Sequence, residues 1–231
     1  MTLDAVNSYT GGTTISQGSV TINNDSSLGS GDVTFATGTT LHTAKDVAIA
    51  NKVTLTGNTT VNNANDLVMN GVLGVGSLTK TGVGSLTLTG SNTYAGGLMV
   101  VEGKVVVNNA TALGSGKATF AANTILETAA PVTLANDIGL AGNVILNSNG
   151  QDSTLSGVVS GAGSLIKQDA GSLTLAGVNT YTGGTIINGG KVIIGQSAAL
   201  GTGTATFAPN TTLEIVSSTT PASLVTLGNT L

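Results

Sequence analysis

The sequence predicts an all-β chain, folded as a parallel β-solenoid of about ten or eleven coils with essentially no helix. Three observations support this prediction: a long internal repeat, many short apolar runs separated by turn residues, and a composition rich in glycine but poor in aromatic and charged residues. The repeat indicates the architecture, the runs supply the strands, and the composition limits the chemistry available to the chain.

The repeat is clearest in a six-residue segment, Asn92–Gly97, which is matched by Asn7–Gly12 and Asn179–Gly184. The tyrosines of these segments are separated by 94 − 9 = 85 and 181 − 94 = 87 residues, so the repeating unit has roughly 86 residues. We therefore expect one continuous array over residues 1–231, with a partial unit at 1–70, a full unit at 71–156 and a partial unit at 157–231. Because its end units are incomplete, we expect the chain to be a fragment of a longer protein.

Other segments recur with the same offsets and extend the repeat through the unit. They are Leu28–Phe35 with Leu113–Phe120 and Leu200–Phe207; Val47–Asn51 with Val132–Asn136 and, after a short insertion, Val225–Asn229; and Gly76–Lys80 with Gly163–Lys167. The three phenylalanines that end the first set are expected in the core at one equivalent level.

Within a unit, short apolar runs such as Ser85–Thr89, Lys104–Val107 and Val144–Leu146 begin about every 8 to 10 residues and are bounded by Gly, Asn, Ser or Asp. A propeller blade needs roughly 40 to 50 residues with its own aromatic motif, and no such period occurs here. A repeat that starts and stops partway through a unit is not expected in a β-sandwich. A solenoid with coils of about 20 to 25 residues explains the spacing, with Gly and Asn at the corners and about four coils to a unit. We also expect the asparagine pairs, such as Asn62-Asn63, to stack their amides along the axis.

The composition excludes several classes of protein. Charged residues are only 8% and mean hydropathy is +0.34, which argues against a disordered chain. No apolar run approaches the length of a membrane-spanning helix, so we expect no direct membrane insertion of this segment. The seven basic residues are all lysine and the net charge is −4, which argues against nucleic-acid binding. Cysteine is absent, so disulfides and thiolate sites are excluded.

Two longer stretches resemble the passenger-associated transport repeat of bacterial autotransporters: Gly84–Val107, and Gly171–Thr185 continued through Gly190–Ile194. A truncated copy covers Asn7–Ile22. The resemblance implies a right-handed β-helix on the surface of a Gram-negative cell, secreted through an outer-membrane barrel at the C-terminus of the same protein. It also implies that the repeat assists secretion or folding. Residues 1–4 lack the features of a signal peptide, and we expect both that peptide and the barrel to be absent from this chain.

Candidate catalytic residues are few. His42 is the single histidine, and the other copies place Glu127 and Glu214 at its position. A catalytic base is not expected to vary among otherwise similar copies, so we interpret His42 as an exposed strand or corner residue. Acidic residues one coil apart, such as Asp46 and Asp66, could meet as a glycosidase pair or a Ca²⁺ site, but eleven scattered acids make such a coincidence expected.

The glycine pairs lack the Gly-Gly-x-Gly-x-Asp pattern of calcium-binding nonapeptides, which argues against a metal role. The three tyrosines could form a sugar-binding ladder, but four coils would separate them by roughly 19 Å. We expect each tyrosine to pack over a glycine turn with its hydroxyl bonded to the backbone. Thr-x-Thr pairs such as Thr87–Thr89 are typical of ice-binding faces, but they are not expected to recur at coil spacing.

We therefore predict a non-enzymatic, surface-exposed stalk or adhesin scaffold, with no catalytic, cofactor-binding or metal-binding residues and no cofactor. The expected partners are a ligand on a host or neighbouring-cell surface, or a second copy bound through the solenoid ends. Two alternatives remain open at this point. One is a β-helix that binds or degrades polysaccharide, and the other is the subunit of a self-associating extracellular filament, because uncapped coil ends expose ladder edges.

Overall fold

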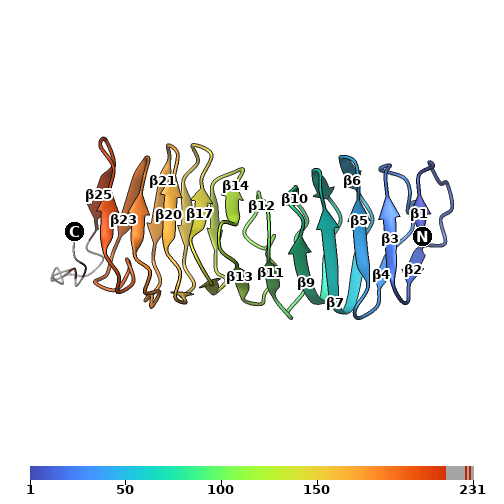
Figure 1. Cartoon of the computed structure of the whole chain (residues 1–231), viewed down its shortest axis with the longest axis horizontal. Helices are drawn as coiled ribbons and strands as arrows, with labels where there is room; N and C mark the ends of the chain where they lie inside the picture. The colour runs from blue at the N-terminus through green and yellow to red at the C-terminus, as the bar shows by residue number, and fades with distance from the viewer. Residues whose placement is uncertain (217–226, 228, 230–231) are drawn as a thin grey trace. The chain divides into compact units, whose positions relative to one another are not determined.

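The computed structural model describes residues 1–216 together with residues 227 and 229. These residues form an all-β structure of about 11 solenoid turns, and no helix occurs among them (Figure 1). The predicted fold class, an all-β parallel solenoid, is confirmed. Residues 225, 226 and 228 of the last matched segment lie outside the described residues.

The chain forms two compact units, Met1–Ala118 and Thr119–Leu231, and strand β13 (Ala118–Phe120) contains the point of division. The strands of the first unit are β1 (Thr2–Leu3), β2 (Thr13–Ile15), β3 (Ser19–Ile22), β4 (Val33–Phe35), β5 (Thr40–Thr43), β6 (Val47–Ile49), β7 (Val53–Asn63), β8 (Leu67–Met69), β9 (Leu73–Thr81), β10 (Ser85–Leu88), β11 (Leu98–Val100) and β12 (Lys104–Val107). The strands that lie wholly in the second unit are β14 (Ile125–Thr128), β15 (Val132–Leu134), β16 (Ile138–Leu140), β17 (Val144–Asn147), β18 (Ser153–Leu155), β19 (Val159–Ser160), β20 (Leu165–Gln168), β21 (Ser172–Leu175), β22 (Thr185–Ile187), β23 (Lys191–Ile194), β24 (Ala205–Phe207) and β25 (Thr212–Ile215).

In the first unit, parallel pairing links strands of successive coils. One ladder runs β1-β3-β5-β7-β9-β11, and another runs β6-β8-β10-β12. In a further ladder, β2 pairs with β4, and β4 pairs with the long strand β7. Val33 pairs with Val53, and Val53 pairs with Leu73, so a coil contains 20 residues at this point. This coil length divides the repeat of roughly 86 residues into about four coils, as expected.

The second unit is built in the same way. Its ladders run β14-β17-β20-β22-β24, β15-β18-β21-β23-β25 and β16-β19. Leu155 pairs with Leu175 and Ser153 with Leu173, again 20 residues apart. Inward positions alternate with outward ones along most strands, such as β18 and β23, and the inward ones are mostly Val, Leu and Ile.

Corners of the coils use left-handed backbone at equivalent positions. Gly29, Gly114 and Gly201 have φ of 67°, 68° and 65°, so the three copies turn alike. At another corner, Gly38 has φ of 77° while Asn123 and Asn210 both have φ of 63°. Asparagine tolerates this region better than most residues, so the second corner does not require glycine.

Several sequence expectations can be compared with the structure. Phe35 and Phe120 are core residues, 1% and 0% exposed, whereas Phe207 is half-buried. Single threonines recur at coil spacing, because Thr14, Thr34 and Thr54 occupy one outward row in register. The Thr-x-Thr pair that begins at Thr54 is not repeated at Thr34, which is followed by Phe35 and Ala36. In the part of the chain that the structure describes, no helix has the length and apolar character needed to cross a membrane.

Candidate functional site

The repeated six-residue segment forms a corner that joins three consecutive coils. In the middle copy, Asn92 is 3% exposed, and both the oxygen and the nitrogen of its side-chain amide form hydrogen bonds. Its Oδ1 accepts a hydrogen bond from the Leu73 backbone N–H at 2.8 Å, one coil before. Its Nδ2 donates to the Ala112 carbonyl oxygen at 2.6 Å, one coil after. Asn92 therefore pairs backbone groups of two different coils that the strand ladders leave free at this corner.

The third copy repeats this arrangement. Asn179 is 2% exposed, its Oδ1 accepts from the Val159 N–H at 2.8 Å, and its Nδ2 donates to the Ala199 carbonyl at 2.6 Å. In the first copy, Nδ2 of Asn7 donates to the carbonyl of Ser27 at 2.8 Å. The bond to the following coil is thus present in all three copies. We call this set of residues, with the tyrosine and glycines described next, the asparagine corner.

The tyrosine of each copy packs over a glycine of the next coil. Tyr94 is fully buried, its carbonyl accepts a hydrogen bond from the Ser115 N–H at 3.0 Å, and its ring lies against Gly114. A Cβ at Gly114 would lie 2.4 Å from the Tyr94 carbonyl oxygen and 2.8 Å from the ring. Gly201 has the same relation to Tyr181, at 2.4 Å. The predicted packing of tyrosine over a glycine turn is confirmed, but the glycine belongs to the next coil and not to the tyrosine's own segment.

The predicted bond from the tyrosine hydroxyl to the backbone is wrong in the two buried copies. The Tyr181 hydroxyl lies 2.6 Å from Oγ1 of Thr185. Because Thr185 donates its single hydroxyl proton to the Leu200 carbonyl at 3.1 Å, Tyr181 must be the donor to Thr185. The middle copy has leucine at the threonine position, Leu98, and the buried Tyr94 hydroxyl has no hydrogen-bond partner among the residues that the structure describes. Burial raises the pKa of both tyrosines, that of Tyr181 to about 12.

This difference gives a matched prediction. Tyr181→Phe is expected to lower the free energy of unfolding by about 1–2 kcal/mol, because it removes the donor to Thr185 in a buried site. Tyr94→Phe is expected to be neutral or slightly stabilising, because it removes a buried hydroxyl that has no partner. Urea denaturation of both variants measures the difference. Equal losses would contradict the hydrogen-bond assignment.

The glycine pair of the corner allows the backbone of one coil to approach the backbone of the next coil closely. Gly97 has φ of 90°, and a Cβ there would lie 2.5 Å from the Lys117 carbonyl oxygen. A Cβ at Gly116 would lie 2.5 Å from the Gly97 nitrogen. Adjacent coils therefore touch through backbone at this corner, and side chains are excluded from it.

Sequence reasoning missed a second feature of the repeat, a buried lysine. Lys80 is fully buried, and its Nζ donates to the carbonyls of Thr81, Gly82 and Glu102 at 3.1, 2.6 and 3.2 Å. Burial lowers the pKa of Lys80 to about 8, and the nearby Glu102 charge opposes this shift only in part. The signal was present in the sequence, because Leu78 and Lys80 are two residues apart and therefore point to the same inward face.

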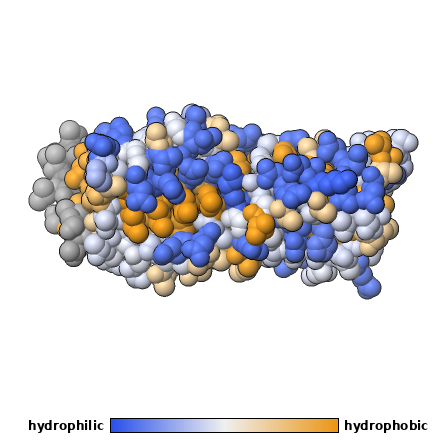
Figure 2. Space-filling view, turned by 45° about the horizontal axis from the view of Figure 1, so that its top comes forward, coloured by the Kyte–Doolittle hydropathy of each residue, from blue (hydrophilic) through white to orange (hydrophobic). Residues whose placement is uncertain are grey.

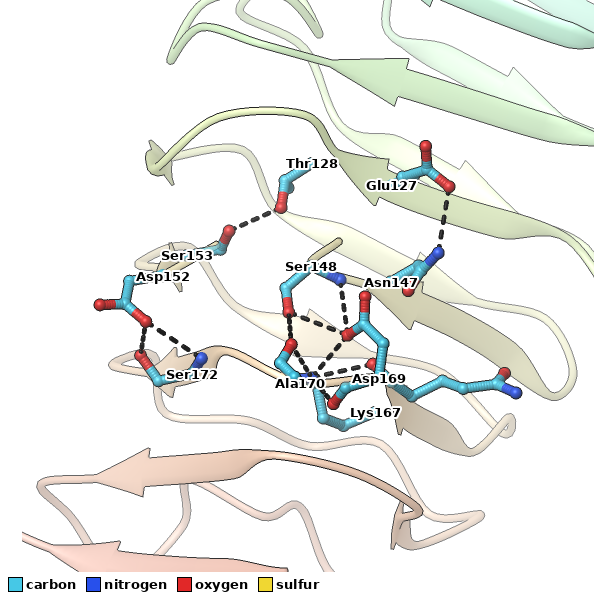
Figure 3. A network of polar contacts seen from close by, with 11 residues as sticks. Glu127, Thr128, Asn147, Ser148, Asp152, Ser153, Lys167, Asp169, Ala170 and Ser172 are labelled. Carbon is cyan, nitrogen blue, oxygen red and sulfur yellow. Dashed lines mark hydrogen bonds and ion pairs between the residues drawn. The ribbon is translucent and has the colours of Figure 1, made fainter. Parts of the chain in front are cut away.

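The equivalent lysine of the third copy has a charged partner (Figure 3). Lys167 is fully buried, and its Nζ donates to the carbonyls of Gln168 and Asp169 at 2.8 and 2.9 Å. The same ammonium forms an ion pair with Oδ1 of Asp169 at 2.9 Å. This oxygen also accepts from the N–H and Oγ of Ser148, one coil before, at 3.2 and 3.0 Å. The lysine therefore links its own turn to the preceding coil.

The lowered pKa of Lys80 predicts a pH dependence. The pKa is about 8 in the folded chain and 10.5 without the fold, so folding disfavours the charged ammonium. This penalty is fully present below pH 8 and is progressively lost as the pH rises from about 8 towards 10.5. The free energy of unfolding of the wild-type chain is therefore expected to rise over this window relative to that of Lys80→Met. Chemical denaturation of both proteins at several pH values measures it, and a constant difference between them would contradict the assignment.

The position of His42 has a different environment in each copy of the repeat. His42 is half-buried and points outward from β5, between Thr21 and Asn62 in register. At its equivalents, Glu127 accepts a hydrogen bond from Asn147 at 3.1 Å, and Glu214 pairs with Lys191 at 2.8 Å. This position therefore has no common chemistry among the copies.

The acidic residues bond to backbone of neighbouring coils. Asp46 and Asp66 do meet, but Oδ1 of Asp46 accepts from the Asp66 backbone N–H at 3.0 Å, so the contact is not a pair of carboxyl groups. Asp137 accepts in the same way from the Val158 N–H at 2.9 Å. Within the described residues, no three His, Asp or Glu side chains are grouped in a way that could hold a metal ion.

The asparagine pairs likewise bond to the backbone, so the expected stacking of their amides is wrong where their bonds are defined. Nδ2 of Asn63 donates to the carbonyls of Asn65 and Ser85 at 2.6 and 2.8 Å. Nδ2 of Asn109 donates to the Thr89 carbonyl at 2.9 Å. Asn63 and Asn109 thus satisfy backbone carbonyls at the corners.

Comparison with known proteins places these features in a family context. The family model described as passenger-associated-transport-repeat matches residues 1–22, 78–107 and 165–194, which include the six-residue segment of each asparagine corner and both buried lysines. The chain is also similar to the adhesin BmaC autotransporter of Brucella suis biovar 1 (strain 1330), with 31% identity over 222 residues. The similarity covers 81% of this chain but only 6% of that adhesin. No solved structure matches the chain.

Proposed function

Because the chain is a repeat segment of an autotransporter passenger, we propose that it is part of a rigid stalk on the cell surface, whose repeats assist folding and secretion. The observation that carries the proposal is the two-sided bonding of Asn92 and Asn179, each of which joins the coil before to the coil after. Both asparagines lie inside the family matches, so they belong to the part of the sequence that defines the repeat.

A solenoid gains most of its stability from contacts between neighbouring coils, so folding can start wherever these contacts are strongest and then propagate. An asparagine corner fixes three coils at once, and the tyrosine over glycine packs the last two of them together. The buried lysine adds further bonds, and Lys80 lies in the coil just before Asn92. We infer that these coils form first as the chain leaves the cell and that the coils between them are added to this nucleus.

The stalk role is mechanical, and it needs no catalytic group. Parallel ladders tie each coil to the next within each unit, and the apolar inward positions give each unit a continuous core. Adhesion itself is proposed here by similarity to the relative's description as an adhesin, and its ligand would lie on a host or neighbouring cell. Binding on glycan arrays and turnover of uronate polymers test the polysaccharide alternative, and a positive result in either would contradict a purely structural role.

Removal of the corner amide tests the proposal. Asn92→Ala is expected to lower the free energy of unfolding by about 2–4 kcal/mol, because it leaves a buried N–H and a buried carbonyl unpaired. Asn188→Ala, at an exposed corner position, is the matched control and should change stability by less than about 0.5 kcal/mol.

The folding role requires a kinetic readout as well. In refolding from urea, Asn92→Ala is expected to slow the folding rate, because contacts present in the transition state affect folding rather than unfolding. Surface display of the parent passenger carrying the same substitution should fall, while Asn188→Ala leaves it unchanged. If Asn92→Ala changed only the unfolding rate and left display intact, the corner would be a stabilising element without a role in folding or secretion.

A further inference from the structure

We propose that Asn149 is a site of spontaneous deamidation, at which the folded chain slowly converts an amide into a carboxylate or an isoaspartyl linkage. Three Asn-Gly dipeptides occur in the sequence, at 70–71, 149–150 and 188–189. Glycine after asparagine favours this reaction, because its lack of a side chain leaves the backbone nitrogen open to approach the amide carbon. The structure separates one of the three from the other two.

The Asn149–Gly150 pair forms the tip of an exposed turn between β17 and β18. Asn149 and Gly150 have φ of 49° and 76°, and the Gln151 N–H donates to the Ser148 carbonyl at 2.8 Å, which together define a type I′ turn. A Cβ at Gly150 would have no atom within 4 Å, so open space surrounds this backbone. Both residues are exposed.

In the other two pairs the asparagine is also exposed, but the glycine backbone lies close to an adjacent coil. A Cβ at Gly71 would lie 1.9 Å from the Asn51 carbonyl oxygen, and the Asn70 side chain accepts a hydrogen bond from Thr89 at 2.9 Å. A Cβ at Gly189 would lie 2.7 Å from the Asp169 carbonyl oxygen. In both pairs the glycine backbone touches an adjacent coil. Rotation of its nitrogen towards the asparagine side chain therefore requires the corner to open.

The reaction needs only water and a solvent base. Base removes the proton from the Gly150 nitrogen, which attacks Cγ of Asn149. The N–Cγ bond forms, the Cγ–Nδ2 bond breaks, and Nδ2 leaves as ammonia with a proton from solvent. Water then opens the five-membered succinimide at one of its two carbonyls. Opening at the side-chain carbonyl gives aspartate, and opening at the backbone carbonyl gives isoaspartate, in which the main chain runs through Cβ.

The structural effect depends on where the turn is attached. Ser148 is fully buried, and its N–H and Oγ bind the Asp169 carboxylate, as Figure 3 shows. An isoaspartyl residue adds one backbone atom between Ser148 and Gly150, so it disrupts the turn bond from Gln151 while the ladder bonds of β17 remain. Each event adds one negative charge to a chain whose net charge is −4.

The test is incubation of the full chain at mildly alkaline pH, with peptide mapping by mass spectrometry to locate aspartate and isoaspartate. In the folded chain, conversion at Asn149 is expected to be roughly tenfold faster than at Asn70 or Asn188. In denaturant, the three sites should convert at similar rates, because the fold that protects two of them is lost. Asn149→Gly keeps a residue suited to positive φ and should remove the fast phase.

Two results would overturn the proposal. One is conversion of Asn70 or Asn188 in the folded chain as fast as that of Asn149. The other is a strong preference for Asn149 that persists in denaturant, since this would assign the reactivity to the local sequence alone. Retained strand content in circular dichroism confirms that the native samples stay folded throughout.

Discussion

Gly114→Ala is expected to lower the free energy of unfolding by about 3 kcal/mol or more. Gly114 has φ of 68°, a region that disfavours residues with a Cβ, and the added methyl would lie 2.4 Å from the Tyr94 carbonyl oxygen. That oxygen is backbone and accepts the Ser115 N–H, so relief of the clash requires neighbouring coils to separate. Urea denaturation monitored by circular dichroism measures the loss.

A matched control separates the clash from the backbone effect. Gly38 also has positive φ, 77°, but a Cβ there would have no atom within 4 Å. Asn123 and Asn210 occupy the equivalent position at φ of 63°, so Gly38→Asn should change stability by less than about 0.5 kcal/mol. Similar losses for the two variants would show that contact between coils through Tyr94 contributes little.

Lys167→Met is expected to lower the free energy of unfolding by about 3–5 kcal/mol. The substitution leaves the Asp169 carboxylate without its cation in a largely buried site, with only Ser148 bound to it. Lys80→Met is the internal comparison. Its loss should be smaller at neutral pH, because Lys80 binds three carbonyls and no carboxylate, and because removing an ammonium that the fold disfavours offsets part of the loss of these hydrogen bonds.

A double-mutant cycle isolates the charge effect. If the loss in Lys167→Met comes from the unpaired carboxylate, Asp169→Asn in the same background should restore part of it, because asparagine is neutral and tolerates the φ of 71° at this position. If the effects of the two substitutions on the free energy of unfolding simply add, the loss comes instead from the turn carbonyls that no longer have the lysine as donor. Unfolding free energies of the four proteins complete the cycle.

The fold could be predicted from the sequence because its determinants are local and repeated. Positions 38, 123 and 210 all have positive φ and turn alike. They are separated by the same 85 and 87 residues that separate the tyrosine segments, so the spacing in the sequence predicts equivalent corners. A 20-residue coil follows from the pairing of Val53 with Leu73, within the range that strand spacing allows. The same repetition predicted tyrosine over a glycine turn, because each copy of the tyrosine stands beside a Gly-Gly pair.

The chemistry of the corner could be predicted only in part, because it depends on which backbone groups the coils leave unpaired. The sequence shows that Asn92 recurs, but the N–H of Leu73 and the carbonyl of Ala112 come from coils 19 and 20 residues away. The Tyr181 hydroxyl bonds to Thr185 because that residue is threonine, whereas Leu98 leaves Tyr94 without a partner. A buried lysine was unexpected, because burial of its charge depends on carbonyls that only the folded turn brings together.

Native-state hydrogen exchange tests the central claim, that the asparagine corners are the most stable coils and the nucleus for folding. The account predicts that the N–H groups of Leu73 and Val159, bound by the corner asparagines, are among the last to exchange, together with that of Ser115. Amides of strands outside these coils, such as β6, should exchange sooner. Uniform protection along the chain, or slowest exchange in coils that lack a corner, would contradict the claim.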